Sequence, residues 1–321
     1  MRVAVFGAGA VGGYLGLRLA QGGADVSFIA RGAHLEAMRE RGLTLITPEG
    51  DRSTVAVQAT DDPAEVGPVD VVLFLVKSYD TDAAARRLSP LIGDGTGVVS
   101  LQNGIDNEER IAASVGREHV LGGAAYILAA IEAPGVVRSN RARIVVGEPE
   151  AGPPSERVQR LVDVAIAGGV DAAAADDVRR VKWEKYVLLV AFAAVTAATQ
   201  LTVGDVRGSE AASAMMRAIM VEAWSIGRAL GVPLADDHVD RAHALVLAQA
   251  DNEGTSLRHD LLTGHRMELE ALQGTLRRLG RETGVPTLWT DAAYAILQPW
   301  AIRNERQSAD QSSAPAGAQD R

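Results

Sequence analysis

Three glycines near the start of the chain have the spacing of a phosphate-binding loop. The apolar residues 3–6 lead directly into Gly7, Gly9 and Gly12, and residues 14–20 are helix-forming. Gly7 allows a tight turn out of the strand, Gly9 lets the backbone approach a pyrophosphate, and Gly12 lets the helix pack against the strand. The residues predicted to bind the pyrophosphate of a dinucleotide are Gly7, Ala8, Gly9, Ala10, Val11 and Gly12.

An arginine follows the second β-pattern and indicates which dinucleotide is bound. Residues 25–30 alternate as a strand does and end directly before Arg31. A site for NAD places an acidic side chain at this point to bind the ribose 2′-hydroxyl, whereas an arginine suits a 2′-phosphate. The sequence therefore favours NADPH. The competing interpretation, a glycine-rich turn with a solvated arginine, is disfavoured by the order of strand, loop, helix and strand.

Polar side chains also follow two later apolar runs. Residues 69–76 form a continuous apolar run, which is typical of a central parallel strand buried on both faces, and Lys77 comes next. Asn103 follows the run 98–101 in a similar way. Ligands bind at the carboxyl ends of strands in open α/β sheets, so we expect Lys77 and Asn103 at the binding edge. Each residue alone is equally compatible with a solvated lysine or a turn asparagine.

Lys185 is a candidate proton donor. It begins a helix face that continues through Leu189, Phe192 and Ala193, all of which are apolar. Desolvation and neighbouring cations lower the pKa of a lysine, which would let Lys185 protonate a carbonyl oxygen near neutral pH as the carbon accepts hydride. The alternative is that the Lys185 stem lies along the helix and its amine reaches water.

Ser256 and Glu268 are further candidates in the second half of the chain. They are twelve residues apart on two expected helices, a spacing that can bring both to one cleft. A solvent-facing Glu268 remains the alternative. The six histidines have no convincing ligand spacing, so we predict no metal site.

The pattern of hydrophobic residues predicts two domains of different class. An α/β domain with a doubly wound sheet is expected over residues 1–170, an all-helical substrate and catalytic domain over 175–304, and a disordered tail over 305–321. The expected strands are 3–6, 25–30, 43–47, 54–58, 69–76, 98–101, 120–123, 136–137 and 144–146. The expected helices are 14–20, 34–41, 156–166, 178–198, 209–230, 238–249, 256–263, 267–283 and 288–302.

Composition excludes several classes of partner. The 321 residues carry a formal net charge of −9, which opposes binding to nucleic acid or to an anionic membrane surface. The longest apolar run, 186–199, is too short to cross a bilayer as a helix. The absence of cysteine excludes disulfides, thiolate catalysis and cysteine-ligated zinc. We therefore expect a cytoplasmic protein that acts on small molecules.

Taken together, these motifs resemble the ketopantoate reductase family, the 2-dehydropantoate 2-reductases, over residues 1 to about 300. The resemblance rests on Gly7-x-Gly9-x-x-Gly12, Arg31, Val76-Lys77, Gln102-Asn103-Gly104 with Glu108, Pro134-Gly135-Val136, Trp183-x-Lys185, Thr255-Ser256-x-x-x-Asp260 and Glu268-x-x-x-x-Gln273-Gly274. The combination is far more specific than any one of its members. It implies a Rossmann domain followed by a helical domain of the 6-phosphogluconate-dehydrogenase type, with the substrate between them.

The resemblance also implies an activity and a role for each site residue. The activity is the NADPH-dependent reduction of the 2-oxo group of ketopantoate to (R)-pantoate, in pantothenate and coenzyme A biosynthesis. Lys185 is then the general acid, Glu268 binds the substrate hydroxyl and contacts the cofactor, and Ser256 contacts the substrate. Lys77 and Asn103 lie beside the nicotinamide and the substrate. A homodimer is compatible with the resemblance.

Two departures from the family pattern leave alternatives open. Family members usually have asparagines at the positions of Leu189 and Ala193, one and two turns after the lysine. A pocket without these amides is less polar, which suggests a paralogue that reduces a less polar 2-oxo acid. A non-catalytic dinucleotide-binding regulator is disfavoured because Lys185 is retained. Arg31 disfavours a methyltransferase.

Overall fold

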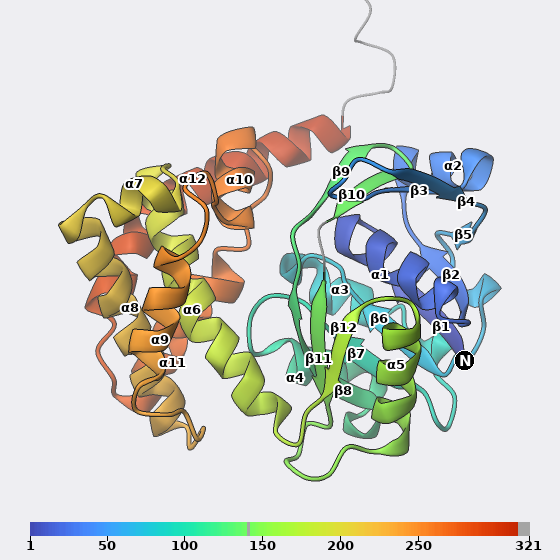
Figure 1. The fold of residues 1–321 in the computed structure, drawn as a ribbon, viewed down its shortest axis with the longest axis horizontal. Coiled ribbons are helices and arrows are strands. Elements are labelled where there is room, and N and C mark those ends of the chain that lie inside the picture. Colours follow the sequence, from blue (N-terminus) through green and yellow to red (C-terminus); the bar gives the residue numbers. More distant parts are fainter. Residues whose placement is uncertain (140–141, 314–321) are drawn as a thin grey trace, which may run out of the picture. The chain divides into compact units, whose positions relative to one another are not determined.

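The chain consists of two compact units. The computed structural model describes residues 1–139 and 142–313. Its contacts divide the chain into Met1–Lys182, here called the sheet unit, and Trp183–Arg321, here called the helical unit (Figure 1). The division falls inside helix α6 (Val178–Thr199). The predicted fold class, a doubly wound α/β sheet followed by an all-helical part, is confirmed.

The main sheet of the sheet unit has the strand order β12-β11-β8-β7-β6-β1-β2-β5. Its strands are β1 (Arg2–Phe6), β2 (Asp25–Ile29), β5 (Gln58–Thr60), β6 (Val71–Phe74), β7 (Gly97–Ser100), β8 (Val120–Tyr126), β11 (Arg143–Gly147) and β12 (Asp171–Ala174). In the order of the sheet, β8, β7, β6, β1, β2 and β5 are all parallel to their neighbours within this group. β11 pairs antiparallel with β8. The carboxyl ends of β1, β2, β6 and β7 therefore meet at one edge of the sheet.

Both faces of this sheet are covered. Because side chains alternate along a strand, Val5 of β1 packs in a cluster with residues of α1 (Ala10–Gln21) and α5 (Glu156–Ala167). Phe6 points to the opposite face and packs with residues of α3 (Thr81–Ala85) and α4 (Asn107–Val115). A further helix, α2 (Gly32–Arg41), follows β2. Burial on both faces explains the continuous apolar run that predicted β6.

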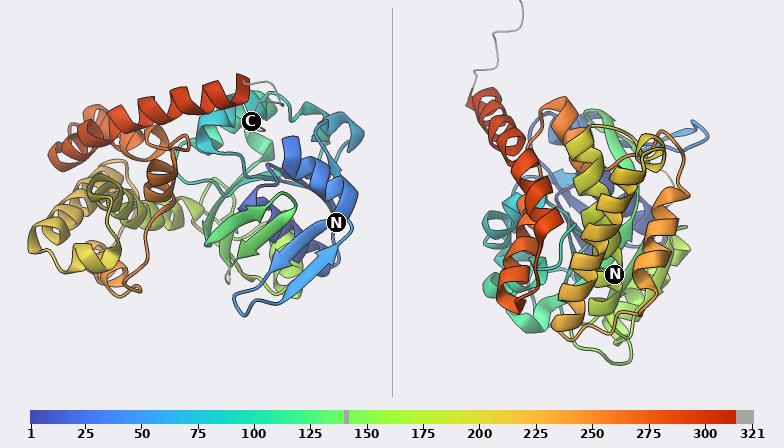
Figure 2. Two further views of the ribbon diagram at one scale, coloured as in Figure 1. Left: turned by 90° about the horizontal axis from the view of Figure 1, so that it is seen from above. Right: turned by 90° about the vertical axis from the view of Figure 1, so that its left-hand side faces the viewer.

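A second, smaller sheet lies against α1 and was not predicted as such. Its order is β4 (Arg52–Val55), β3 (Leu43–Ile46), β10 (Val136–Ser139) and β9 (Ala129–Ala133) (Figure 2). The expected strand 136–137 is present as β10, but it belongs to this smaller sheet and not to the main one, because it pairs with β3 and β9. The predicted strand 54–58 is divided between β4 and β5, which belong to different sheets.

The helical unit is built around the alanine-rich second part of α6. The side chains of Val187, Val190 and Ala194 are completely buried, because small and β-branched residues let neighbouring helices approach closely. The other elements are α7 (Val203–Arg207), α8 (Glu210–Ala229), α9 (His238–Leu247), α10 (Ser256–Thr263), the π-helical turn η5 (Glu270–Gly274), α11 (Thr275–Thr283) and α12 (Leu288–Ser313). Figure 2 shows α12 as the long red helix of this unit.

The end of α12 differs from the expectation of a disordered tail. The helix continues to Ser313, so residues 305–313 of the predicted tail are helical, while 314–321 lie outside the described residues. The Asn304 side chain donates hydrogen bonds to the carbonyls of Asp260 and His265, and Glu305 forms an ion pair with Arg266 at 2.8 Å. These contacts hold the helix past its predicted end.

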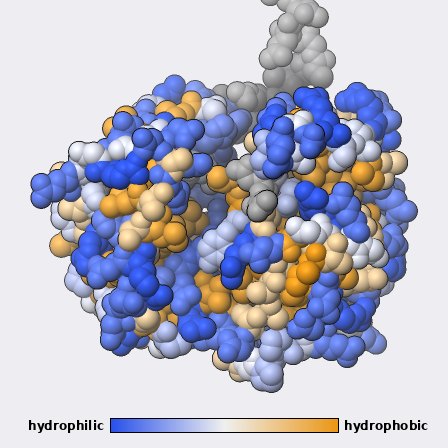
Figure 3. All heavy atoms as spheres, in the orientation of Figure 1, coloured by the Kyte–Doolittle hydropathy of each residue, from blue (hydrophilic) through white to orange (hydrophobic). Residues whose placement is uncertain are grey.

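The surface mixes hydrophilic and hydrophobic residues. On the face drawn in Figure 3, small hydrophobic groups are interspersed among hydrophilic ones. Among the described residues, no helix has both the length and the apolar character needed to span a membrane.

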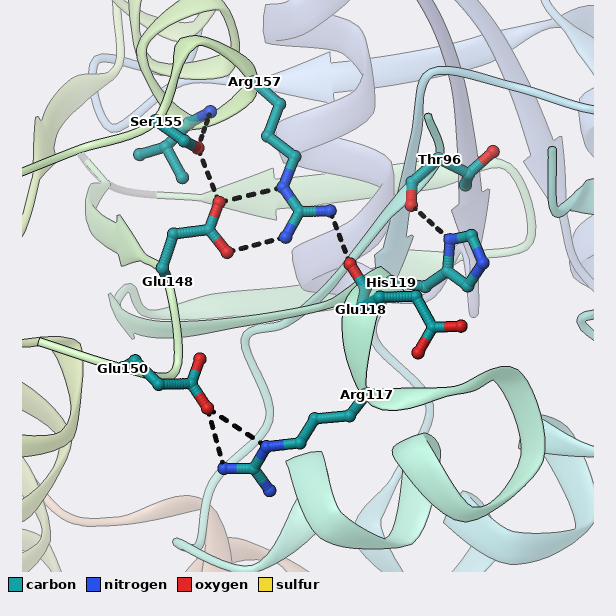
Figure 4. Close-up of polar contacts among 9 residues, drawn as sticks. Thr96, Arg117, Glu118, His119, Glu148, Glu150, Ser155 and Arg157 are labelled. Carbon is teal, nitrogen blue, oxygen red and sulfur yellow. Dashed lines mark hydrogen bonds and ion pairs between the residues drawn. The ribbon is translucent and has the colours of Figure 1, made fainter. Parts of the chain in front are cut away.

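A polar cluster closes the amino edge of the main sheet, opposite the carboxyl ends of β1, β2, β6 and β7. Glu148 follows β11 and accepts two hydrogen bonds from the Arg157 guanidinium, at 2.9 and 2.6 Å, and one from the Ser155 hydroxyl (Figure 4). Arg157 also donates to the carbonyl of Glu118. Burial alone would raise the pKa of Glu148, but the bonds from Arg157 and Ser155 outweigh it and hold the pKa below its ordinary value of 4.5.

We expect Glu148→Gln to destabilise the protein in a pH-dependent way. A carboxylate with a lowered pKa stabilises the folded state above its unfolded pKa, and this contribution is lost as pH falls through the folded pKa. The variant should lower the free energy of unfolding by about 1–3 kcal/mol at pH 7. The deficit should shrink below the ordinary pKa of 4.5.

Denaturant titrations of both proteins at a series of pH values measure this effect. Glu150→Gln is the matched control, because the Glu150 pair with Arg117 is exposed and contributes little (Figure 4). A deficit for Glu148→Gln that is constant down to pH 3 contradicts the assignment.

Candidate functional site

The glycine-rich loop after β1 has a backbone that only glycine allows at two positions. Gly7 has a φ of +98°, and a Cβ there would lie 2.7 Å from the Val76 nitrogen. A Cβ at Gly12 would lie 2.5 Å from the Gly7 carbonyl oxygen. The Gly7 and Ala8 N–H groups both donate to the carbonyl of Ile29, at 3.1 and 3.0 Å. The loop is therefore held tightly between β2 and the end of β6.

The start of α1 fits an anionic group. A Cβ at Gly9 would have no atom within 4 Å, so the backbone is open at this point. Gly9 is the N-cap of α1 and supplies no side-chain cap, and the first turn of the helix holds no acidic residue. The partial positive charge of the helix N-terminus is therefore not neutralised locally. These features fit the pyrophosphate of a dinucleotide.

Arg31 and His34 lie at the start of α2, and of the two only the arginine is permanently charged. Arg31 is the N-cap of α2, directly after the β2 edge, and is exposed. His34, one turn later, accepts a hydrogen bond at Nδ1 from the Gly135 N–H at 3.1 Å. Burial lowers the pKa of His34, although a hydrogen bond to the Ala8 backbone acts in the opposite direction. Arg31 is thus the side chain that brings permanent positive charge to this turn.

A buried hydrogen-bond network joins the loops that carry Lys77 and Asn103. The Gln102 amide donates to the Val76 carbonyl at 2.8 Å and to the Thr81 hydroxyl at 2.9 Å. Asn107 in turn donates to the Asn103 carbonyl at 2.9 Å. Because β6 and β7 are neighbours in the sheet, this network fixes the two loops beside each other.

A buried ion pair joins α4 to the first part of α6. The Lys182 ammonium contacts the Glu108 carboxylate, and both side chains are largely buried. Burial raises the pKa of Glu108, and the nearby Lys182 charge opposes this shift. Removing one partner of such a pair is costly, because it leaves an uncompensated buried charge.

The lysines of this chain are few, and their positions are informative. Of 32 basic residues, only Lys77, Lys182 and Lys185 are lysines, and the others are arginines. Arginine is effectively never deprotonated in proteins, whereas an amine can bind and release a proton. Lys77 and Lys185 are among the predicted site residues, whereas Lys182 is not. The rarity of lysine was the signal that could have found it.

In the helical unit, three predicted site residues lie on segments that contact one another. Lys185 is on α6, Ser256 is the first residue of α10, and buried Glu268 precedes η5. The Tyr186 hydroxyl of α6 donates to the Leu272 carbonyl of η5 at 2.6 Å. Lys185 and Glu268 are therefore carried by two segments with a direct hydrogen bond between them.

A second contact ties Ser256 to the same helix. Thr255, the N-cap of α10, accepts the Arg258 N–H at 3.3 Å through its hydroxyl. The same hydroxyl lies 3.2 Å from that of Thr196 on α6, and both threonines are buried. Thr196 also donates to the Phe192 carbonyl, which fixes its rotamer.

The predicted site residues thus fall into two groups, one in each unit. The group at the carboxyl edge of the main sheet contains Gly7, Ala8, Gly9, Ala10, Val11, Gly12, Arg31, Lys77 and Asn103. The group in the helical unit contains Lys185, Ser256 and Glu268. Ala193 is completely buried on α6, and Leu189 is half-buried. Among the described residues no group of side chains could hold a metal ion.

Two family models match the chain, one on each part. The model described as Ketopantoate reductase PanE/ApbA matches residues 3–151. The model described as Ketopantoate reductase PanE/ApbA C terminal matches residues 177–301.

Curated relatives are similar over nearly the whole chain. A 2-dehydropantoate 2-reductase of Mesorhizobium japonicum is 33% identical, over 94% of this chain and 98% of the relative. A 2-dehydropantoate 2-reductase of Halobacterium salinarum is 32% identical, over 92% of this chain and 98% of the relative.

Solved structures have the same fold. The crystal structure of a PanE/ApbA family ketopantoate reductase from Ralstonia eutropha JMP134 has a TM-score of 0.87 and 34% identity, over 95% of this chain and 100% of that one. A D-mandelate dehydrogenase solved with NADH and anilino(oxo)acetate also has a TM-score of 0.87, but only 21% identity. That second likeness concerns the fold alone.

We expect Gly9→Ala to weaken cofactor binding without affecting the fold. The added methyl group would enter open space, where no protein atom lies within 4 Å but where a pyrophosphate would approach the backbone. The dissociation constant for NADPH should rise at least about tenfold. Isothermal titration calorimetry measures the affinity, and thermal unfolding without cofactor should show a cooperative transition that is lowered only by the poorer N-cap that alanine provides for α1. Gly95→Ala, also in open space, is the control. Equal affinity in all three proteins would show that the loop does not hold the pyrophosphate.

Proposed function

Because the chain belongs to the ketopantoate reductase family, we propose that it reduces the 2-oxo group of ketopantoate to pantoate with NADPH. The observation that carries this proposal is the similarity, over 94% of the chain, to a curated relative named 2-dehydropantoate 2-reductase. These relatives favour ketopantoate over the less polar 2-oxo acid that Leu189 and Ala193 suggested. They also favour an enzyme over a non-catalytic regulator.

The sheet unit provides the binding residues for the cofactor. The open backbone at Gly9 and the uncapped start of α1 suit the pyrophosphate. The choice of NADPH over NADH is supported by Arg31 at the start of α2 and by the absence of an acidic residue from the first turn of this helix. When bound, the nicotinamide supplies a hydride to the carbonyl carbon of the substrate.

The helical unit provides the proton donor. As the carbonyl carbon accepts hydride, negative charge develops on the carbonyl oxygen. The Lys185 ammonium stabilises this charge and transfers a proton from Nζ to the oxygen, which forms the hydroxyl group of pantoate. The neutral amine then regains a proton from solvent. An arginine could stabilise the charge but could not release the proton.

Two further residues orient the substrate in the proposed site. The Glu268 carboxylate accepts a hydrogen bond from the substrate hydroxyl and also contacts the cofactor. The Ser256 hydroxyl, at the positively polarised start of α10, donates to the substrate carboxylate or binds its hydroxyl. Lys77 and Asn103, at the carboxyl edge of the sheet, contact the nicotinamide and the substrate.

The setting of the activity is also part of the proposal. The predicted domains 1–170 and 175–304 would bind the cofactor and the substrate, respectively. The enzyme would work in the cytoplasm, in pantothenate and coenzyme A biosynthesis. The exposed apolar side chains of Leu288, Trp289 and Ile296 on α12 would support a homodimer.

We expect replacement of Lys185 to abolish most of the activity. Wild-type protein mixed with NADPH and ketopantoate should oxidise the cofactor and form pantoate. Lys185→Ala should lower kcat by about 10²–10⁴-fold, because the general acid is lost. Lys185→Arg keeps the charge but cannot release a proton, so it should also fail. Affinity for NADPH should stay within about twofold in both variants. Near-full turnover by either variant would place the proton donor elsewhere.

We expect Arg31→Ala to remove the preference for NADPH. Loss of the guanidinium should weaken NADPH binding by about tenfold or more and leave NADH binding nearly unchanged, because only NADPH carries the 2′-phosphate. Kinetic comparison of kcat/KM for the two cofactors measures the preference. The exposed Arg160 of α5 provides the control variant Arg160→Ala. An unchanged ratio in Arg31→Ala would refute the cofactor assignment.

A further inference from the structure

Two buried side chains clamp one turn of α6 to the segment that carries Glu268. The Tyr186 hydroxyl donates to the Leu272 carbonyl at 2.6 Å, and the Gln273 amide donates to the Val190 carbonyl at 2.9 Å. Tyr186 and Val190 are one helical turn apart and therefore lie on one face of α6. Leu272 and Gln273 are neighbours within η5. The two bonds run in opposite directions and close a ring between α6 and η5. This pair of bonds, made by Tyr186 and Gln273, is here called the clamp.

Both side chains of the clamp are buried, although both are polar. The side chain of Gln273 is completely inaccessible, and that of Tyr186 is 2% exposed. Burying an amide and a phenol away from water is unfavourable unless each is hydrogen-bonded, so neither residue is explained by hydrophobic packing. A methionine and a phenylalanine would fill the same space without polar atoms. The polar groups therefore indicate that hydrogen bonds, and not burial alone, define the position of η5 relative to α6.

The proposed catalytic residues adjoin both ends of the clamp. Lys185 precedes Tyr186 in α6, so its side chain projects about 100° around the helix from the clamped face. On the other segment, the Glu268 carbonyl accepts the Leu272 N–H at 3.3 Å, and the Leu269 carbonyl accepts the Gly274 N–H at 3.0 Å. The second bond is the wide turn of a π-helix, a feature that is frequent at functional sites. A short chain of bonds thus runs from Lys185 through Tyr186 and Leu272 to Glu268.

We propose that Tyr186 and Gln273 are positioning residues, whose hydrogen bonds set the separation between the Lys185 amine and the Glu268 carboxylate. This inference rests on the proposed function of that pair. Neither residue touches the reacting atoms. Each acts by holding η5 against one turn of α6, so that the proton donor and the carboxylate meet the substrate in a fixed geometry. Small displacements of reacting groups reduce rates strongly, which gives the clamp a kinetic consequence.

Tyr186→Phe tests the proposal because it removes a single hydroxyl group. We expect kcat for ketopantoate to fall by about 10–10²-fold, with the affinity for NADPH unchanged. Gln273→Met, which removes the other bond, should have a similar effect and serves as the second variant. With NADPH deuterated at the transferred position, the isotope effect on kcat should increase in both variants, because chemistry becomes more rate-limiting.

A matched control separates positioning from general destabilisation. Thr290 also uses a buried hydroxyl, which donates to Glu222 at 2.6 Å between α12 and α8. Thr290→Val should leave kcat and the isotope effect unchanged at a temperature where all variants are folded, as judged by circular dichroism. Equal kinetic losses in Thr290→Val and Tyr186→Phe would overturn the proposal.

The double variant Lys185→Ala/Tyr186→Phe shows whether the effect passes through the proposed acid. If Tyr186 acts by positioning Lys185 against Glu268, adding Tyr186→Phe to Lys185→Ala should lower the residual activity by less than about twofold. A further loss as large as that in the wild-type background contradicts positioning. Wild-type activity in folded Tyr186→Phe and Gln273→Met overturns the inference alone. Wild-type activity in Lys185→Ala overturns the proposed role of Lys185 as the proton donor, on which the inference rests.

Discussion

The helical unit depends on side-chain hydrogen bonds between α6 and two segments packed against it, the π-helical turn η5 and the cap of α10. Tyr186 and Gln273 connect α6 to η5, and Thr196 connects it to the cap of α10. These are polar contacts inside an otherwise alanine- and valine-rich core, where an unmade hydrogen bond is expensive. The helix that carries Lys185 is therefore also the support for the segments of Glu268 and Ser256.

In the sheet unit the corresponding constraint is the parallel pairing of neighbouring strands. Because β2, β1, β6 and β7 run in one direction, the loops after them are collected at one edge. Backbone contacts hold the glycine loop against the end of β6, and the buried Gln102 amide holds the loops after β6 and β7. The polar cluster around Glu148 lies at the opposite edge of the sheet and does not include the loops of the proposed cofactor site (Figure 4).

The elements that were predicted correctly are those whose hydrophobic periodicity and terminal residues indicate the same structure. Elements without such signals were missed. Residues 256–263 begin after a threonine cap and end at a glycine, and α10 has these bounds. By contrast, β12 has the sequence Asp-Ala-Ala-Ala, whose residues have low β-propensity, and it forms because β11 supplies a pairing edge. The clamp residue Gln273 was noted only as part of a motif, since a hydrogen bond to Val190 depends on tertiary packing. Lys182 was missed because its partner, Glu108, is distant in sequence.

The identity of the preferred substrate is the most direct test of the proposed ketopantoate reductase activity. Initial rates of NADPH oxidation should be measured with ketopantoate and with a panel of branched, linear and aromatic 2-oxo acids. We expect kcat/KM for ketopantoate to exceed that for every other acid by at least about tenfold. A preference for a less polar 2-oxo acid, or no turnover of any member of the panel, would contradict it.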